Sequence, residues 1–142
     1  MTAQADVFLE QAALAEDRSP LYAGLCRRFA EHEAVRAIVG PSPAWDAPLR
    51  LLAGLHYLVL NAEAEWEGVD GALGDHRAFL TSWVAEQGVQ TNEVQRSWTL
   101  LPCFLEVARR TGAAAFDLVE LGPAAGLNLV WDRYRYRYRH GP

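Results

Sequence analysis

The chain has 142 residues, 51% of them hydrophobic and 22% charged, which is the composition of a folded globular protein rather than of a disordered one. Its net charge is −5, and all 13 basic residues are arginine, because the sequence contains no lysine. No apolar run approaches the roughly 20 residues of a membrane-spanning helix, and the N-terminus lacks the basic leader of a secretory signal. We therefore expect a cytoplasmic protein that does not enter the membrane.

Helical periodicity predicts about five helices before Gly112. A helix from Ser19-Pro20 follows from a good capping residue beside a proline at the first helical position. The helix that Pro48 opens is apolar around nearly its whole circumference, which is typical of a central, buried helix. Residues 61–74 are acidic and contain glycine, so a loop is expected there. The other predicted helices span 3–17, 75–87 and 92–110.

A core is expected where the apolar faces of these helices meet. Cys26 and Cys103 lie in apolar stretches and are expected to be buried, reduced thiols. His56 is expected to be a core histidine bonded to a neighbour. The residues predicted to be buried in mutual contact are Leu52, Leu55, Leu58, Trp83, Trp98 and Leu105.

The hydrophobic period changes after Gly112. Phe116–Leu121 is a short apolar run bounded by turn residues, the pattern of a buried parallel strand, and residues 127–134 resume a helical pattern. The predicted fold class is therefore mainly α, followed by the first β-turn-α unit of a Rossmann-like α/β domain that is truncated here. The expected organisation is a helical region over 1–111 and the start of a cofactor-binding domain over 112–142.

The turn between this strand and helix holds the candidate site residues Glu120, Gly122, Ala124 and Gly126. A glycine-rich turn lets the backbone approach a ligand, and a helix N-terminus favours negative charge. The spacing fits neither the G-x-G-x-x-G dinucleotide fingerprint nor a P-loop. A tight structural turn without a ligand is the alternative.

A second polar cluster lies at the start of the helix predicted from Asn92. Asn92, Glu93 and Arg96 could serve only to cap that helix and face solvent. The functional interpretation is that they face the Gly122–Gly126 turn and complete a cofactor site.

The C-terminal residues Arg133 to Arg139 alternate arginine and tyrosine, as a half-buried strand with two unlike faces would. Interleaved basic and aromatic residues could also bind nucleic acid. The four arginines contribute +4, which leaves −9 for the rest of the chain. This acidic remainder argues against nucleic acid as the main partner.

Four stretches, SPLYAGLCRRFA, LRLLAGLHYLVL, VQTNEVQRS and VELGPAAGLNLVWDRYRYRY, together resemble the uncharacterised bacterial family called domain of unknown function 2332. That family looks like a relative of the class I, Rossmann-type S-adenosylmethionine-dependent methyltransferases. The resemblance implies a helical N-terminal region, a methyltransferase-like α/β domain and S-adenosylmethionine as cofactor. Ala124 departs from the usual middle glycine of the methyltransferase turn, and the family's members are longer than this chain.

We therefore expect the N-terminal segment of a methyltransferase-like protein, with unknown substrate, inactive as this fragment and with weak or absent binding of S-adenosylmethionine by it. An acidic residue that holds the ribose is expected about 20 residues beyond the glycine turn, by analogy with dinucleotide sites, and only Asp132 is acidic after Gly126. The expected partners are a small-molecule cofactor and a second copy that pairs with the free strand edge. A non-catalytic helical interaction module with a structural glycine turn is the alternative. No spacing of cysteine and histidine predicts a metal site.

Overall fold

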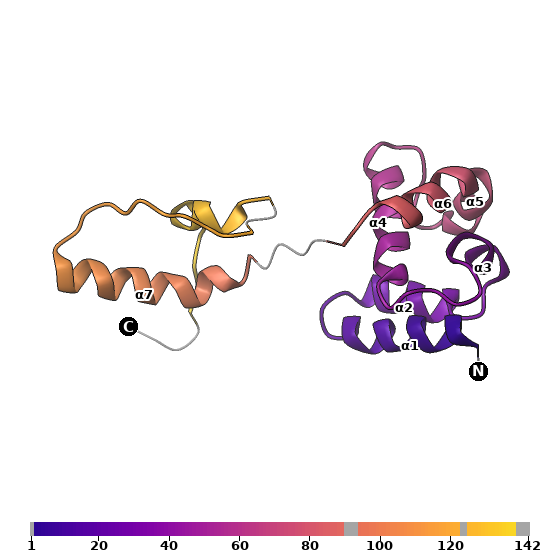
Figure 1. The fold of residues 1–142 in the computed structure, drawn as a ribbon, viewed down its shortest axis with the longest axis horizontal. Coiled ribbons are helices and arrows are strands. Elements are labelled where there is room, and N and C mark those ends of the chain that lie inside the picture. The colour runs from indigo at the N-terminus through magenta and orange to yellow at the C-terminus, as the bar shows by residue number, and fades with distance from the viewer. Residues whose placement is uncertain (1, 90–93, 123–124, 139–142) are drawn as a thin grey trace. The chain divides into compact units, whose positions relative to one another are not determined.

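The computed structural model describes residues 2–89, 94–122 and 125–138, and the chain divides into two compact units, Met1–Val89 and Gln90–Pro142 (Figure 1). The described residues form helices and irregular segments, and no β-strand occurs among them. The mainly helical part of the predicted fold class is therefore correct. The unit boundary precedes the last long helix, so that this helix belongs with the glycine turn.

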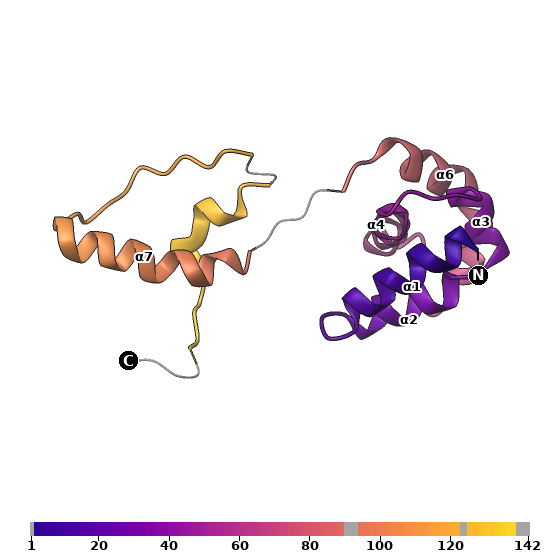
Figure 2. The ribbon, with the colours of Figure 1, turned by 60° about the horizontal axis from the view of Figure 1, so that its bottom comes forward.

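The first unit is an all-helical body. Its helices are α1 (Ala3–Ala15), α2 (Pro20–Phe29), α3 (Glu33–Val39), α4 (Ala47–Leu60), α5 (Val69–Asp75) and α6 (Arg77–Glu86). Helices α1 and α2 lie side by side, with α4 packed against both α1 and α6 (Figures 1 and 2). The Ser19 side chain accepts a hydrogen bond from the Tyr22 backbone N–H, which confirms the predicted start at Ser19-Pro20.

Helix α5 corrects the loop that was expected over residues 61–74. All of this helix except its last residue lies inside that range. Three of its side chains, Val69, Ala72 and Leu73, are buried in the core of the first unit. Two glycines within α5 disfavour a helix locally, but packing of this apolar face outweighs their propensity.

The core of the first unit centres on α4, as its sequence predicts. Leu52, Leu55 and Leu58 are buried in one hydrophobic cluster. Trp83 is half-buried, with its ring against those of Tyr57 and Phe79. The rest of the expected core does not join it.

Four residues expected in the core are exposed. Trp98 and Leu105 are 60% and 59% exposed, because they belong to the second unit, whose described residues leave this face of their helix uncovered. Cys103 is exposed on the same helix, whereas Cys26 is buried. His56 lies on an exposed face of α4, although its Nδ1 does share a 2.8 Å hydrogen bond with the Tyr22 hydroxyl.

The second unit consists of α7 (Arg96–Thr111), an irregular segment and the 3-10 helix η1 (Leu127–Arg133). Gly112 ends α7 in the left-handed conformation with φ of 72°, as expected of a C-terminal glycine. The segment after it runs back along α7 towards η1 (Figures 1 and 2).

Phe116–Leu121 is not a strand among the described residues, contrary to the sequence-based expectation. A strand requires a neighbour with which to exchange backbone hydrogen bonds, and no other extended segment of the described residues pairs with this one. The helix predicted over 127–134 is present as the shorter-pitched η1. The β-turn-α unit is thus not formed as predicted, because its β element is unpaired.

Candidate functional site

Two glycines of the predicted turn adopt a backbone conformation that favours glycine over other residues. Gly122 and Gly126 have φ of 65° and 69°, in the left-handed region. An L-residue there costs about 1–2 kcal/mol. A Cβ would have open space at Gly122 and an ordinary contact with Leu129 at Gly126, so that backbone conformation rather than crowding selects glycine.

A hydrogen-bonded chain of three side chains joins α7, η1 and the turn. The Ser97 hydroxyl, in the first turn of α7, donates to Asn128 Oδ1 at 3.4 Å. Asn128 Nδ2, in η1, donates to Glu120 Oε1 at 3.2 Å. Ser97 is 1% exposed, so this chain is anchored inside the second unit.

The second carboxylate oxygen of Glu120 lacks a hydrogen-bond partner in this network. Glu120 Oε2 is buried and has no hydrogen-bond partner among the described residues. An unsatisfied buried polar atom costs about 1–3 kcal/mol, and such an atom in a folded protein requires an explanation, such as a functional role or a bound water or ion. A carboxylate oxygen can only accept, so its missing partner is a hydrogen-bond donor or a cation.

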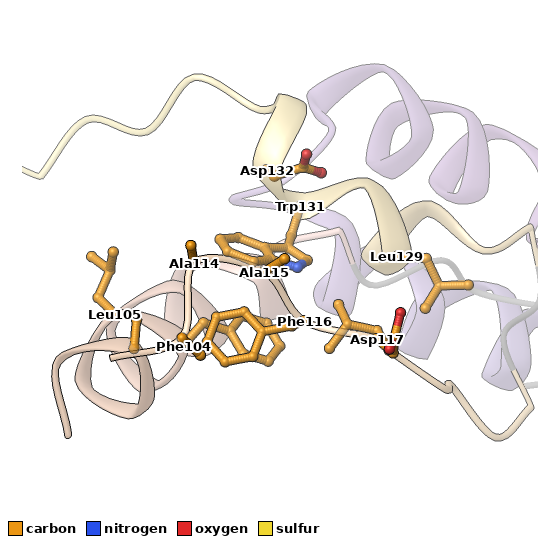
Figure 3. Close-up of a pocket in the computed structure, with 12 residues that line it drawn as sticks. Phe104, Leu105, Ala114, Ala115, Phe116, Asp117, Leu129, Trp131 and Asp132 are labelled. Atoms are coloured by element: carbon orange, nitrogen blue, oxygen red, sulfur yellow. The ribbon is translucent and has the colours of Figure 1, made fainter. Parts of the chain in front are cut away.

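One cavity adjoins this carboxyl group, and a second cavity lies next to the first. The first, of about 290 Å³, is lined by Glu120 and Asn128 together with apolar side chains that include Leu100 and Leu121. The other, of about 640 Å³, lies beyond Phe104 and is aromatic (Figure 3). The two share the lining residues Phe104, Leu118 and Leu129.

The larger cavity is shaped by three rings. Phe104 of α7 stacks on Trp131 of η1 with ring centroids 4.5 Å apart, and Phe116 lies at 5.9 Å from Phe104. Figure 3 shows these rings together, with Asp117 and Asp132 also at the rim. The result is an apolar, aromatic wall with a few polar groups, which is typical of a small-molecule site.

The segment that leads to the turn alternates between two environments. Phe116, Leu118 and Glu120 are half-buried towards α7 and η1, whereas Val119 and Leu121 are 88% and 92% exposed. This period of two is the side-chain pattern of a strand. The segment therefore presents Glu120 inwards at the mouth of the turn.

The structure brings together three of the predicted site residues, Glu120, Gly122 and Gly126. Arg96 is exposed in the first turn of α7, next to the Ser97 that reaches Asn128. Asn92, Glu93 and Ala124 lie outside the described residues.

Sequence reasoning missed Ser97, Asn128, Phe104 and Trp131. The signal for Asn128 was present, because a polar residue two positions after Gly126 stands alone between leucines. Ser97 lay beside a polar cluster that was already suspected.

The first unit has two polar clusters of a different kind. Tyr22, His56 and Trp66 pack edge to face, with ring centroids 5.5–6.3 Å apart, which leaves no room for a ligand between the rings. Arg28 of α2 pairs with Asp70 of α5. These contacts hold helices together. Within the described ranges, no group of three side chains is arranged to bind a metal ion.

The chain belongs to the family described as an uncharacterized protein conserved in bacteria, DUF2332, whose family model matches residues 5–142. The match includes both units and confirms the resemblance at the level of the family. No curated protein and no solved structure matches the chain. Among the described helices, none combines the length and apolar character that crossing a bilayer requires.

Proposed function

We propose that the second unit carries the S-adenosylmethionine-binding turn of a methyltransferase-like protein. The observation that supports this most strongly is the buried, unpartnered oxygen of Glu120 at a turn with two left-handed glycines. Glu120 Oε2 has no hydrogen-bond donor within the described part of the chain, and Glu120 stands where the acid of the methyltransferase turn commonly meets the amine of the cofactor.

Each side chain has a distinct part in this proposal. Asn128 holds Glu120 through Oε1, which leaves Oε2 free to accept from the cationic amine of the cofactor. Gly122 and Gly126 keep the turn free of side chains, so that its backbone can contact the ligand closely. Arg96 is exposed in the first turn of α7, and in this proposal it meets the cofactor carboxylate.

The alternating segment 116–121 agrees with this proposal. A class I methyltransferase strand is covered on both sides by helices, and its residues are apolar on both faces. Val119 and Leu121 supply the second apolar face. In the proposed domain they would pack against a further layer, and neighbouring strands would pair with the segment.

The bound cofactor would supply an electrophilic methyl group on a sulfonium centre, and the protein's task is to bind and orient it. The acceptor substrate stays unassigned. The aromatic cavity beside Trp131 shares lining residues with the cavity that Glu120 lines, and it is the place where an apolar or aromatic acceptor would fit.

Isothermal titration with S-adenosylmethionine tests the proposal on the 142-residue chain and on a product that includes any residues its gene encodes beyond Pro142. Glu120→Gln removes the accepting charge, and Glu106→Gln is the matched control, since Glu106 pairs with two arginines on the exposed side of α7. A hydrogen bond to a charged group contributes about 1.5–3 kcal/mol, so Glu120→Gln should weaken binding about 10- to 150-fold. Equal affinity of the two variants, or no binding by any form, would contradict the proposal.

The alternative function is a non-catalytic interaction module. It is favoured by the exposed apolar side chains of the second unit, which include Trp98, Leu105, Val107, Val119 and Leu121. Large exposed apolar groups of this kind mark protein contacts when they are contiguous. Absence of cofactor binding together with self-association in sedimentation would favour this alternative.

A further inference from the structure

The residues after η1 form a segment whose three tyrosine hydroxyls all donate to backbone carbonyls. The Tyr134 hydroxyl donates to the Leu127 carbonyl at 2.6 Å, and the Tyr136 hydroxyl donates to the Trp131 carbonyl at 2.7 Å. The Tyr138 hydroxyl reaches the Trp98 carbonyl of α7 at 2.9 Å. Three hydrogen bonds therefore fix this segment against η1 and α7.

The arginines that alternate with these tyrosines are exposed. Arg133, at the end of η1, is followed by Arg135 and Arg137, and all three have exposed side chains. None of them forms an ion pair with another residue that the structure describes. We call these three residues the arginine row. Alternate residues of an extended chain project to the same side about 6.6 Å apart, so Arg135 and Arg137 extend along one line.

The charge of the chain is divided unequally between its two units. Residues 1–89 contain 13 acidic and 6 basic residues, whereas residues 90–142 contain 5 acidic and 7 basic residues. Within the second unit, Glu106 is already paired with Arg109 and Arg110 and Glu120 is turned inwards, whereas Asp117 and Asp132, the latter next to Arg133, are exposed. The negative total therefore does not describe the surface that the arginine row presents.

We propose that the arginine row binds the phosphate backbone of single-stranded nucleic acid. A guanidinium group matches a phosphate in charge and in its paired donors. A line of cations along one extended segment follows a single backbone, as in the charged grooves of single-strand binders. None of these arginines has a part in the proposed cofactor site, and the inference does not depend on that site.

The tyrosines make this interaction independent of base sequence. Their hydroxyls are already bonded to carbonyls, and two of the three rings are half-buried, so they hold the arginines in place instead of stacking on bases. Phosphate contacts alone carry no sequence information. Single-stranded DNA and RNA of mixed sequence should therefore bind equally well.

The salt dependence of binding follows from the number of phosphates contacted. Each contact with a single strand changes the logarithm of affinity by about 0.7 per logarithm of salt concentration. Three arginines predict a slope of about −2.1, or roughly a 20-fold loss of affinity between 50 and 200 mM salt. Arg135→Gln with Arg137→Gln leaves one contact, a slope of about −0.7 and roughly a threefold loss.

Fluorescence anisotropy of a labelled thymidine oligonucleotide, titrated with the full chain, measures this dependence. The matched control is Arg109→Gln with Arg110→Gln, which removes the same charge from the same unit at arginines already paired with Glu106. Circular dichroism establishes that each variant keeps its helices. We expect the control to keep the slope of the original chain and the Arg135/Arg137 variant to lose about two thirds of it.

Three results would overturn the proposal. The first is no binding at 50 mM salt, and the second is an equal change of slope in the two double variants, which would show an effect of net charge alone. The third is equally tight, Arg135-dependent binding of a polyglutamate peptide, which would assign the arginine row to an acidic protein.

Discussion

Alanine substitution at two helical glycines tests the packing of α4 against α6. A Cβ at Gly54 would lie 3.0 Å from Trp83 Cδ1 and 3.1 Å from Leu80 Cδ2, closer than the roughly 3.5–4.0 Å of favourable carbon contacts. Crowding of this kind costs about 1–3 kcal/mol, whereas alanine in place of glycine gains about 0.8–1 kcal/mol of helix propensity. We therefore expect Gly54→Ala to reduce the free energy of unfolding by about 0–2 kcal/mol.

Gly24→Ala is the matched control, because a Cβ at Gly24 in α2 meets no atom within 4 Å. It should gain helix propensity without crowding and stabilise the protein by about 0.4–1 kcal/mol. Thermal unfolding followed by near-ultraviolet circular dichroism would separate the variants, since 1 kcal/mol shifts Tm by about 4–8 °C in a unit of this size. Equal stabilisation by both substitutions would refute the close approach of Trp83 and Leu80 to α4.

Three further predictions concern stability and side-chain chemistry. Leu55→Ala, at a fully buried position of α4, should cost about 2–5 kcal/mol in urea unfolding, and a loss below 1 kcal/mol would show that the core is misplaced. Burial raises the pKa of the Cys26 thiol to about 11. At pH 8 a disulfide reagent should therefore modify only the exposed Cys103 until the protein unfolds. Rapid modification of both thiols in the folded protein would contradict this. Hydrogen bonds from Arg109 and Arg110 lower the pKa of the Glu106 carboxyl from 4.5 to about 2. Because this pKa is depressed in the folded state, the stabilisation from the pairing is fully present above about pH 4.5 and is lost as the pH falls through about 2. A carbon-13 titration of the Glu106 carboxyl with a midpoint near 4.5 would contradict the pairing.

The sequence predicted those parts of the fold that depend on local chemistry. Ser19 caps α2, Gly112 ends α7 with a positive φ, and one face of α4 is central to the core, although Tyr57 and Leu60 on its other face are exposed. The loop expected over 61–74 was wrong in part, because the burial of Val69 and Leu73 in α5 depends on partners distant in sequence. Local propensity contains no information about such partners.

The same limit explains the errors in the second unit. The apolar stripe expected on α7 was wrong in part, because Trp98 and Leu105 are exposed, whereas Phe104, which was not assigned to the stripe, packs against Trp131. The run 116–121 has the alternation of a strand in its burial without forming one, because strand pairing is non-local. Periodicity identifies an element's faces and leaves their partners undetermined.

The candidate site was predictable to the extent that it follows from backbone conformation. Gly122 and Gly126 were selected by spacing, and both adopt the left-handed conformation that requires glycine. The network through Ser97 and Asn128 was missed, because it joins residues 31 positions apart. Glu120 was chosen by its spacing from the glycines, and its unpartnered oxygen became visible only in three dimensions.

The proposed cofactor turn is tested most directly by amide chemical shifts. A ¹⁵N-labelled chain would be titrated with S-adenosylhomocysteine to millimolar concentration, at which even weak binding is visible. We predict saturable shifts of the amides of Gly122, Gly126 and Asn128, with the amides of α1 to α6 unchanged, and loss of these shifts in Glu120→Gln. Absence of shifts at the turn, or shifts confined to the first unit, would contradict the proposal that this turn binds the cofactor.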